Sequence, residues 1–241
     1  MLETITRGRT NEPPRILCYG MEGIGKSTFG AGFPNPVFIQ TEDGLGNVDC
    51  AKFPLCEQYE DAIRQLAALK DEKHDFKTVV VDSVDWLERL IWDRVCREQK
   101  VDSIEAIGYG RGYAFALTYW REFIGALEAL RKSKKTLVLL LAHAVAEDYV
   151  DPEVTAGFKR FTPRLHKTAK SLVSEYVDAI LLATRKFGAA TGGANNPRIV
   201  RVEPSPVQVA KSRYAIPAEL PLDASAVLSA IQQSLETSDA N

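Results

Sequence analysis

The residues best suited to chemistry form one glycine-rich stretch near the start of the chain, GMEGIGKS at positions 20–27. It has Gly-x-x-x-x-Gly-Lys-Ser at every fixed position, the spacing of a loop whose backbone N–H groups wrap a phosphate chain. Lys26 is expected to place a positive charge near the β- and γ-phosphates, and Ser27 to offer a hydroxyl to Mg²⁺. The sequence therefore predicts a site for ATP and Mg²⁺. The residues expected to hold the nucleotide are Gly20, Met21, Glu22, Gly23, Ile24, Gly25, Lys26, Ser27 and Thr28.

Two acidic positions extend this hypothesis. Asp82 ends the apolar run TVVVD, and an aspartate at the carboxyl end of a parallel strand can hold Mg²⁺ through water. The alternative for Asp82 is a helix N-cap. Glu42, in VFIQTED, follows another strand and is expected to polarise the attacking water. Asp43 is the neighbouring candidate, and spacing alone does not separate the two; a solvated turn carboxylate is the alternative reading.

Strand-like and helical runs alternate along the chain, which predicts an α/β fold with a mainly parallel central sheet flanked by helices. The expected strands cover 15–19, 37–40, 78–82, 136–142 and 178–183, and the expected helices 59–70, 86–95, 115–130 and 224–235. Residues 198–202 and 207–210 are expected to form an antiparallel hairpin at the sheet edge. The predicted organisation is an N-terminal arm (1–14), a core (15–222) and a C-terminal helix and tail (223–241).

Composition excludes some classes of protein. The 241 residues carry a formal net charge of −2, so any binding of nucleic acid must come from local patches. The four cysteines form no metal-binding pair of two-residue spacing. No apolar run is long enough to cross a bilayer, and the N-terminus lacks the apolar centre of a signal peptide. We expect a cytoplasmic protein that has no membrane partner.

The order of phosphate loop, Glu42 and Asp82 resembles the ATPase core of RecA-type recombinases, over about residues 15–220. The resemblance implies a RecA-like fold, and two further segments match. LLLAH places His143 where that family keeps a residue that senses the γ-phosphate. AKSRYAIP resembles the segment that reaches the γ-phosphate of the adjoining subunit, which implies that Lys211 and Arg213 act across a junction in a filament or ring. As a bare pattern, two basic residues near a surface hairpin are commonly just solvated.

A basic segment at 156–170 contains interleaved phenylalanines and no acidic residue. Such a mixture suits single-stranded DNA, because cations follow the phosphates while aromatic faces accept bases. By resemblance it corresponds to the family's second DNA-binding loop, with IGYGRGY at 107–113 as the first. The expected DNA contacts are Tyr109, Arg111, Lys159, Arg160, Phe161, Arg164 and Lys167. The alternatives are a flexible basic loop that closes over nucleotide, or an exposed helix face.

Little of this chain lies outside the core, so within the family it most resembles the RecA-like single-strand annealing proteins of bacteriophages. The resemblance implies a slow, DNA-linked ATPase that binds single-stranded DNA, promotes annealing or recombination and works with a single-strand-binding protein in a bacterial cytoplasm. Three alternatives stay open: a hexameric helicase or DNA motor, a small-molecule phosphotransferase, and a nucleotide-binding regulator that hydrolyses little.

Overall fold

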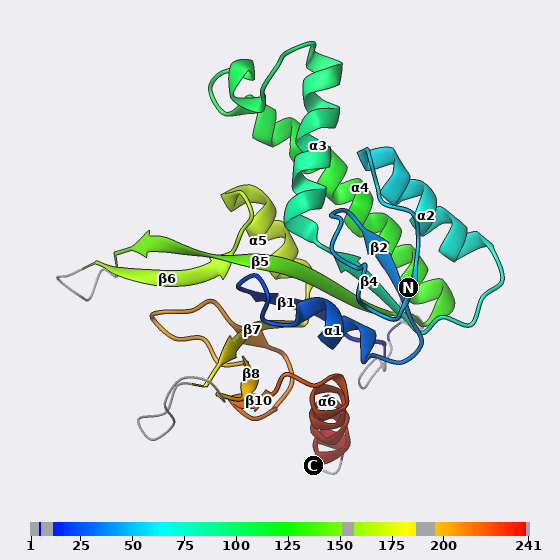
Figure 1. The fold of residues 1–241 in the computed structure, drawn as a ribbon, viewed down its shortest axis with the longest axis vertical. Helices are drawn as coiled ribbons and strands as arrows, with labels where there is room; N and C mark the ends of the chain where they lie inside the picture. The colour runs from blue at the N-terminus through cyan, green and yellow to red at the C-terminus, as the bar shows by residue number, and fades with distance from the viewer. Residues whose placement is uncertain (1–4, 6–11, 151–156, 187–195, 240–241) are drawn as a thin grey trace.

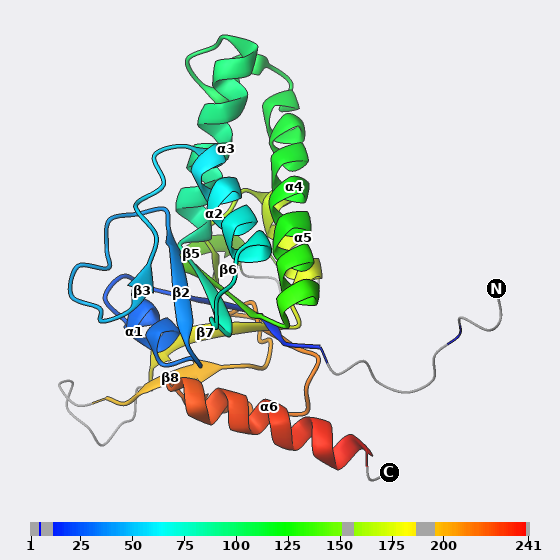
Figure 2. The ribbon, with the colours of Figure 1, turned by 90° about the vertical axis from the view of Figure 1, so that its right-hand side faces the viewer.

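A mainly parallel sheet separates two layers of helices (Figures 1 and 2). The structure is a computed structural model that describes residue 5 and residues 12–150, 157–186 and 196–239. Its parallel strands are β1 (Arg15–Gly20), β2 (Pro36–Gln40), β4 (Thr78–Asp82), β5 (Leu137–Tyr149) and β7 (Ala179–Arg185). The strand order is β10-β8-β7-β1-β5-β4-β2-β3. The predicted fold class, a mainly parallel α/β sheet flanked by helices with an antiparallel edge, is confirmed.

The remaining elements complete the sheet and cover it. The short strands are β3 (Ala51–Lys52), β6 (Phe158–Pro163), β8 (Arg198–Arg201), β9 (Lys211–Ser212) and β10 (Glu219–Pro221). The helices are α1 (Lys26–Ala31), α2 (Tyr59–Asp71), α3 (Val84–Gln99), the 3₁₀ turn η2 (Ile104–Ile107), α4 (Arg111–Lys134), α5 (Lys167–Tyr176) and α6 (Ala224–Asp239). No helix in the described part of the chain combines the length and apolarity needed to cross a membrane.

Each face of the sheet has its own apolar core. Alternate residues of β1 point to opposite faces, so Leu17 and Tyr19 pack with α2 to α5 while Ile16 and Cys18 pack with α1 and α6. Figure 2 shows these two helical layers on either side of the strands. Because both faces are covered, the central strands are apolar along their length, which is the pattern that made them predictable.

The antiparallel edge differs from the predicted hairpin. β8 pairs antiparallel with β7 and with β10, and residues 207–210 form no strand beside it. Instead, Val207 and Val209 are bound to Phe161 of β6 by backbone hydrogen bonds of 2.8 and 2.9 Å. Pro204 and Pro206 lack N–H donors, which disfavours a continuous ladder returning along β8. The expectation of a 198–202/207–210 hairpin is therefore wrong.

Strand β5 is longer than predicted and leaves the main sheet. Its first half pairs with β1 and β4, and its second half pairs antiparallel with β6, from Ala144 opposite Pro163 to Tyr149 opposite Phe158. This two-stranded extension, called the β5–β6 arm below, projects from the body of the molecule (Figure 1). The expected basic loop is thus largely a strand in its described part, and most of the expected N-terminal arm (1–14) lies outside the described residues.

Candidate active site

The glycine-rich loop joins β1 to α1, as its sequence context predicts. Gly23 and Gly25 have φ values of 72° and 105°, a left-handed conformation that side chains disfavour. The ammonium of Lys26 lies inside the loop, where it donates to the carbonyl oxygens of Gly20 at 3.1 Å and Met21 at 3.3 Å. Lys26 is only 7% exposed, and this burial lowers its pKa. The loop therefore encloses a cation without pairing it directly to a carboxylate, which leaves its charge for an anionic ligand.

Ser27 and Asp82 meet at the position expected for Mg²⁺. The hydroxyl of Ser27 donates a 2.7 Å hydrogen bond to Asp82 Oδ2. Burial raises the pKa of Asp82, and the bond from Ser27 opposes that increase. The N-cap of α3 is Ser83, so the capping alternative for Asp82 is not what the structure has. A hydroxyl and a carboxylate are oxygen ligands of the kind that Mg²⁺ prefers, and the pair fits that ion together with phosphate oxygens.

Glu42, rather than Asp43, faces this cluster. Its Oε1 lies 3.8 Å from Nε2 of His143, and Asp43 is exposed. Burial raises the pKa of Glu42, the nearby His143 lowers it, and Asp82 is among the charges that raise it further. His143 lies beside Gly20 in the β1–β5 register, which places it next to the phosphate loop. The structure thus gathers five predicted residues at one edge of the sheet: Lys26, Ser27, Glu42, Asp82 and His143.

Asp85 connects this cluster to the β5–β6 arm, and no sequence motif identified it. It is 4% exposed and accepts hydrogen bonds of 3.0 Å from the backbone N–H of His143 and 3.0 Å from its ring Nδ1. Arg164, just after β6, donates to Asp85 Oδ2 from Nε at 3.0 Å and Nη2 at 2.7 Å. Burial raises the pKa of Asp85, but the bonds from His143 and Arg164 outweigh it, so the pKa is lowered.

A line of side chains therefore runs from the expected water-polarising residue to the basic segment: Glu42, His143, Asp85 and Arg164. Arg164 also reaches back to the phosphate loop, where its Nη1 lies 3.6 Å from Glu22 Oε1. We call Glu22, Glu42, Asp85, His143 and Arg164 the linking network. The sequence signal that could have suggested Asp85 is its position three residues after Asp82, beside an apolar helical stripe.

Glu88, one turn after Asp85, is a second buried acid that sequence analysis missed. Its Oε2 accepts a 2.9 Å hydrogen bond from the backbone N–H of His166, so it holds the chain just before α5. Its Oε1 is buried and makes no hydrogen bond of standard geometry among the described residues, although the indole N–H of Trp120 is near enough to lower the pKa of this carboxyl. Burial raises the pKa of Glu88 to about 7, and the charge of Asp85 adds to the increase.

Glu88 should therefore make stability depend on pH. Because its pKa rises from 4.5 in the unfolded chain to about 7 in the fold, protonation favours the folded state. The free energy of unfolding should fall by about 3 kcal/mol as the pH rises from the unfolded-state pKa to the folded-state pKa. Glu88→Gln should remove this loss, so urea unfolding should show the variant to be more stable than wild type at pH 8 and similar at pH 5. Glu57→Gln, at an exposed position, is the control; an unchanged pH dependence in Glu88→Gln would contradict the assignment.

Some of the residues expected to contact DNA on or beside the β5–β6 arm already contact other side chains of the chain. Lys159 pairs with Asp148 of β5 at 2.5 Å, and Arg160 lies over the ring of Tyr149 at 4.7 Å. Arg164 is committed to Asp85, as described above. Phe161 is 40% exposed, and Lys167, at the start of α5, is exposed. The segment itself contains no acid, but strand pairing supplies acids from β5 that partly neutralise it.

Tyr109 and Arg111 lie at the far end of the α3–α4 pair, which extends beyond the sheet (Figure 1). Tyr109 is fully exposed, and Arg111 is exposed at the first residue of α4. Two residues further on, Tyr113 stacks on His166 with ring centroids 3.8 Å apart and planes within 7°. The two segments expected to contact DNA therefore meet where α4 begins and the chain enters α5.

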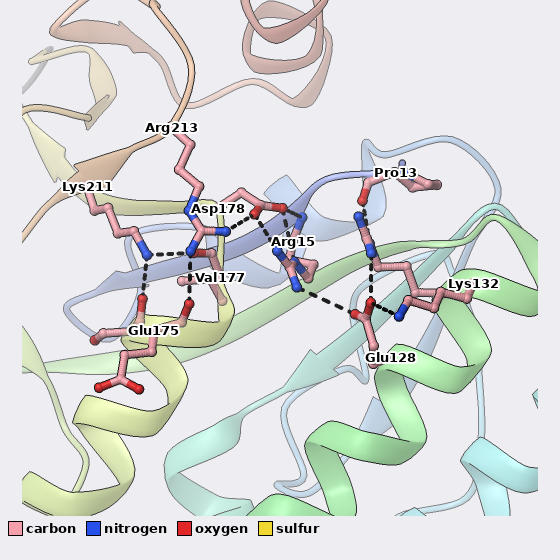
Figure 3. Close-up of polar contacts among 11 residues, drawn as sticks. Pro13, Arg15, Glu128, Lys132, Glu175, Val177, Asp178, Lys211 and Arg213 are labelled. Atoms are coloured by element: carbon pink, nitrogen blue, oxygen red, sulfur yellow. Dashed lines mark hydrogen bonds and ion pairs between the residues drawn. The ribbon is translucent and has the colours of Figure 1, made fainter. Parts of the chain in front are cut away.

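Lys211 and Arg213 lie near the amino ends of the parallel strands, because β9 pairs with the first residues of β7. The phosphate loop lies at the opposite, carboxyl ends. Figure 3 shows both side chains bound within their own chain. Lys211 donates to the carbonyl oxygens of Ser174 and Val177 at 2.7 and 2.8 Å, at the end of α5. Arg213 donates at 2.8 Å to Asp178, which Arg15 also binds at 2.7 Å. Within one chain they do not reach the nucleotide site, so their predicted role stays a prediction.

Fold and site together point to a class of protein, the phosphate-loop NTPases, in which a glycine-rich loop after the first strand meets an aspartate from another parallel strand of the sheet. Residues 12–214 match the model of the AAA domain family, and the chain belongs to that family. A sequence comparison with curated proteins finds no match. Among solved structures, a crystal structure of the RadB recombinase is similar over 79% of this chain and 80% of that chain, at 14% identity and a TM-score of 0.46.

Proposed function

We propose that this chain is a magnesium-dependent ATPase that binds single-stranded DNA and promotes the pairing of complementary strands. ATP occupies the phosphate loop, Ser27 and Asp82 hold Mg²⁺, and Glu42 orients the attacking water. His143 responds to the γ-phosphate. Membership of an NTPase family supports the nucleotide part of this proposal, and the DNA part extends it.

The observation that carries the proposal is the linking network. It connects the carboxylate expected to act on water with Arg164, at the end of the strand that bears Phe161 and Lys159. Because the contacts at Asp85 are buried and charge-assisted, a change in the position of His143 alters the contacts of Arg164. An affinity for single-stranded DNA that depends on bound nucleotide needs such a connection between the two sites.

The position of Lys211 and Arg213 supports assembly of several copies. Both are cations at the sheet edge opposite the loop, so only a neighbouring copy could present them to a γ-phosphate. Arg213 is the freer of the two, with a side chain that is 49% exposed and an Asp178 partner that Arg15 already binds. In the proposed assembly, ATP is bound at the junction between copies.

The test is fluorescence anisotropy of a labelled oligo(dT) strand, with and without a slowly hydrolysed ATP analogue and Mg²⁺. We expect the analogue to tighten binding by at least tenfold. Phe161→Ala should weaken it by about tenfold, as expected for loss of one base–aromatic stack. Leu55→Ala is the control, since Leu55 is equally exposed, at 41%, but lies between β3 and α2.

Annealing of complementary labelled strands should be faster with the ATP analogue than without it, and slower for Phe161→Ala than for wild type or Leu55→Ala. Binding that ignores the nucleotide, or that Phe161→Ala leaves unchanged, would contradict the DNA part of the proposal. DNA-stimulated turnover with strand displacement would instead indicate a helicase or motor. Phosphate transfer to a nucleoside without DNA would indicate a phosphotransferase, and tight nucleotide binding with negligible turnover would indicate a regulator.

A further inference from the structure

A small cavity lies beside the phosphate loop, outside the cluster of Lys26, Ser27, Glu42, Asp82 and His143. Its volume is about 140 Å³. One wall comes from the loop and α1, and the other from β8 and the start of α6. The lining residues are Gly25, Thr28, Phe29, Gly32, Arg198, Leu222, Asp223 and Ala224.

Arg198 is held against the phosphate loop. Leu222 N–H donates to its carbonyl oxygen at 3.0 Å, which fixes the strand at the cavity wall. A Cβ added to Gly25 would lie 2.8 Å from Nη1 of Arg198, so the guanidinium occupies space that is open only because residue 25 is glycine. Within the described part of the chain, the Arg198 guanidinium has no hydrogen-bond or ion-pair partner, whereas Arg201 on the same strand contacts Glu219 at 3.3 Å.

The acidic cluster and this cavity lie on opposite sides of β1 in the sheet order. Asp82 and Glu42 follow β4 and β2, which lie on one side of β1, and β8 and β10 lie on its other side. A triphosphate whose γ-phosphate lies near Lys26, Asp82 and Glu42 therefore crosses the loop with its nucleoside directed toward Arg198. The half-buried Leu222 gives this end of the site an apolar surface.

We infer that the cavity receives the nucleoside of the bound triphosphate and that Arg198 is its binding residue, stacking its planar guanidinium on the base. This inference rests on the proposed binding of ATP. A guanidinium suits the task because it stacks on aromatic faces and needs no carboxylate partner to do so. Arg198 thereby distinguishes a nucleotide from a bare phosphate chain.

Calorimetry with Mg²⁺ and two ligands, ATP and inorganic tripolyphosphate, tests the inference. Arg198→Ala should weaken ATP binding by about tenfold, the loss expected for one partly desolvated cation–π contact. Tripolyphosphate binding should change by less than about twofold, because it has no base. Arg198→Lys should recover only part of the loss, and Arg201→Ala, on the same strand, should match wild type for both ligands.

The possible failures are distinguishable. If wild type binds neither ligand, the proposed function fails. If wild type binds ATP and Arg198→Ala binds it equally well, the cavity is not the nucleoside site. If Arg198→Ala loses affinity for both ligands to the same degree, Arg198 acts on the phosphate chain and the assignment to the base is overturned. Circular dichroism melting should be unchanged in Arg198→Ala, because an exposed side chain without a described partner contributes little to stability.

Discussion

Lys26→Ala is expected to reduce the affinity for MgATP by about 10- to 100-fold. The ammonium of Lys26 is buried in the loop and, among the residues that the structure describes, is bound only to backbone carbonyl oxygens, so its charge is available to phosphate oxygens. Charge-assisted hydrogen bonds of this kind contribute about 1.5–3 kcal/mol, which corresponds to that range of affinity. Isothermal titration calorimetry measures the loss directly.

The free energy of unfolding distinguishes this loss of affinity for MgATP from misfolding of the variant. Lys26 makes no ion pair of contact distance within the described chain, and burial lowers its pKa, so removing it should not reduce the free energy of unfolding. Lys134→Ala is the matched control, because that ammonium also donates to a backbone carbonyl, of Glu72 at 2.8 Å, but lies at the end of α4. Wild-type affinity for ATP in Lys26→Ala would refute the assignment of the loop.

Asp85→Asn is expected to destabilise the fold and to uncouple the two sites. The substitution leaves Arg164 facing an amide, and removing one partner of a buried ion pair costs about 3–5 kcal/mol. Because the side chain of Arg164 is 36% exposed, we expect the lower end, about 3 kcal/mol. ATP binding should persist, since Asp85 does not contact the loop, but the nucleotide should no longer tighten binding to oligo(dT).

The pH dependence gives an independent check on Asp85. The fold lowers its pKa, so its stabilising contribution is present above the unfolded-state value of about 3.9 and is lost as the pH falls through the folded value. Wild type and Asp85→Asn should therefore converge in stability on acidification below about pH 4. Asp93→Asn, exposed on the same helix, is the control. Retention of nucleotide-dependent DNA binding by Asp85→Asn would remove it from the linking network.

The sequence predicted the parts of this molecule that depend on local pattern. Strand 78–82 has the predicted bounds, and Lys26, Ser27, Glu42 and Asp82 are grouped because parallel strands bring their carboxyl ends to one edge. These predictions need only motif spacing and alternation of elements, whereas the place of His143 at the site follows from the family resemblance. The distinction between Glu42 and Asp43 needed the structure, in which Glu42 is partly buried beside His143 and Asp43 is exposed.

The residues that were missed depend on contacts between distant segments. Asp85 and Glu88 are charged positions in a helix, which by pattern alone are expected at its exposed face. They are buried because donors from His143, Arg164 and His166, between 58 and 79 residues away, meet them there. The edge hairpin was wrong for a related reason: the partner of residues 207–209 is Phe161, from a strand whose basic residues hid its extended conformation.

The continuous strand β5 has a mechanical consequence. It passes without interruption from the main sheet, where its partners are β1 and β4, to the projecting arm, where its partner is β6, and His143 sits at the change of partner. The seven residues from His143 to Tyr149 span roughly 20 Å of strand. A tilt of only about 5° at His143 would displace the tip by roughly 2 Å over that length. Because β6 is paired with β5 there, this lever, pivoting beside the glycine-rich turn, would carry with it the exposed Phe161 and Lys159 of β6.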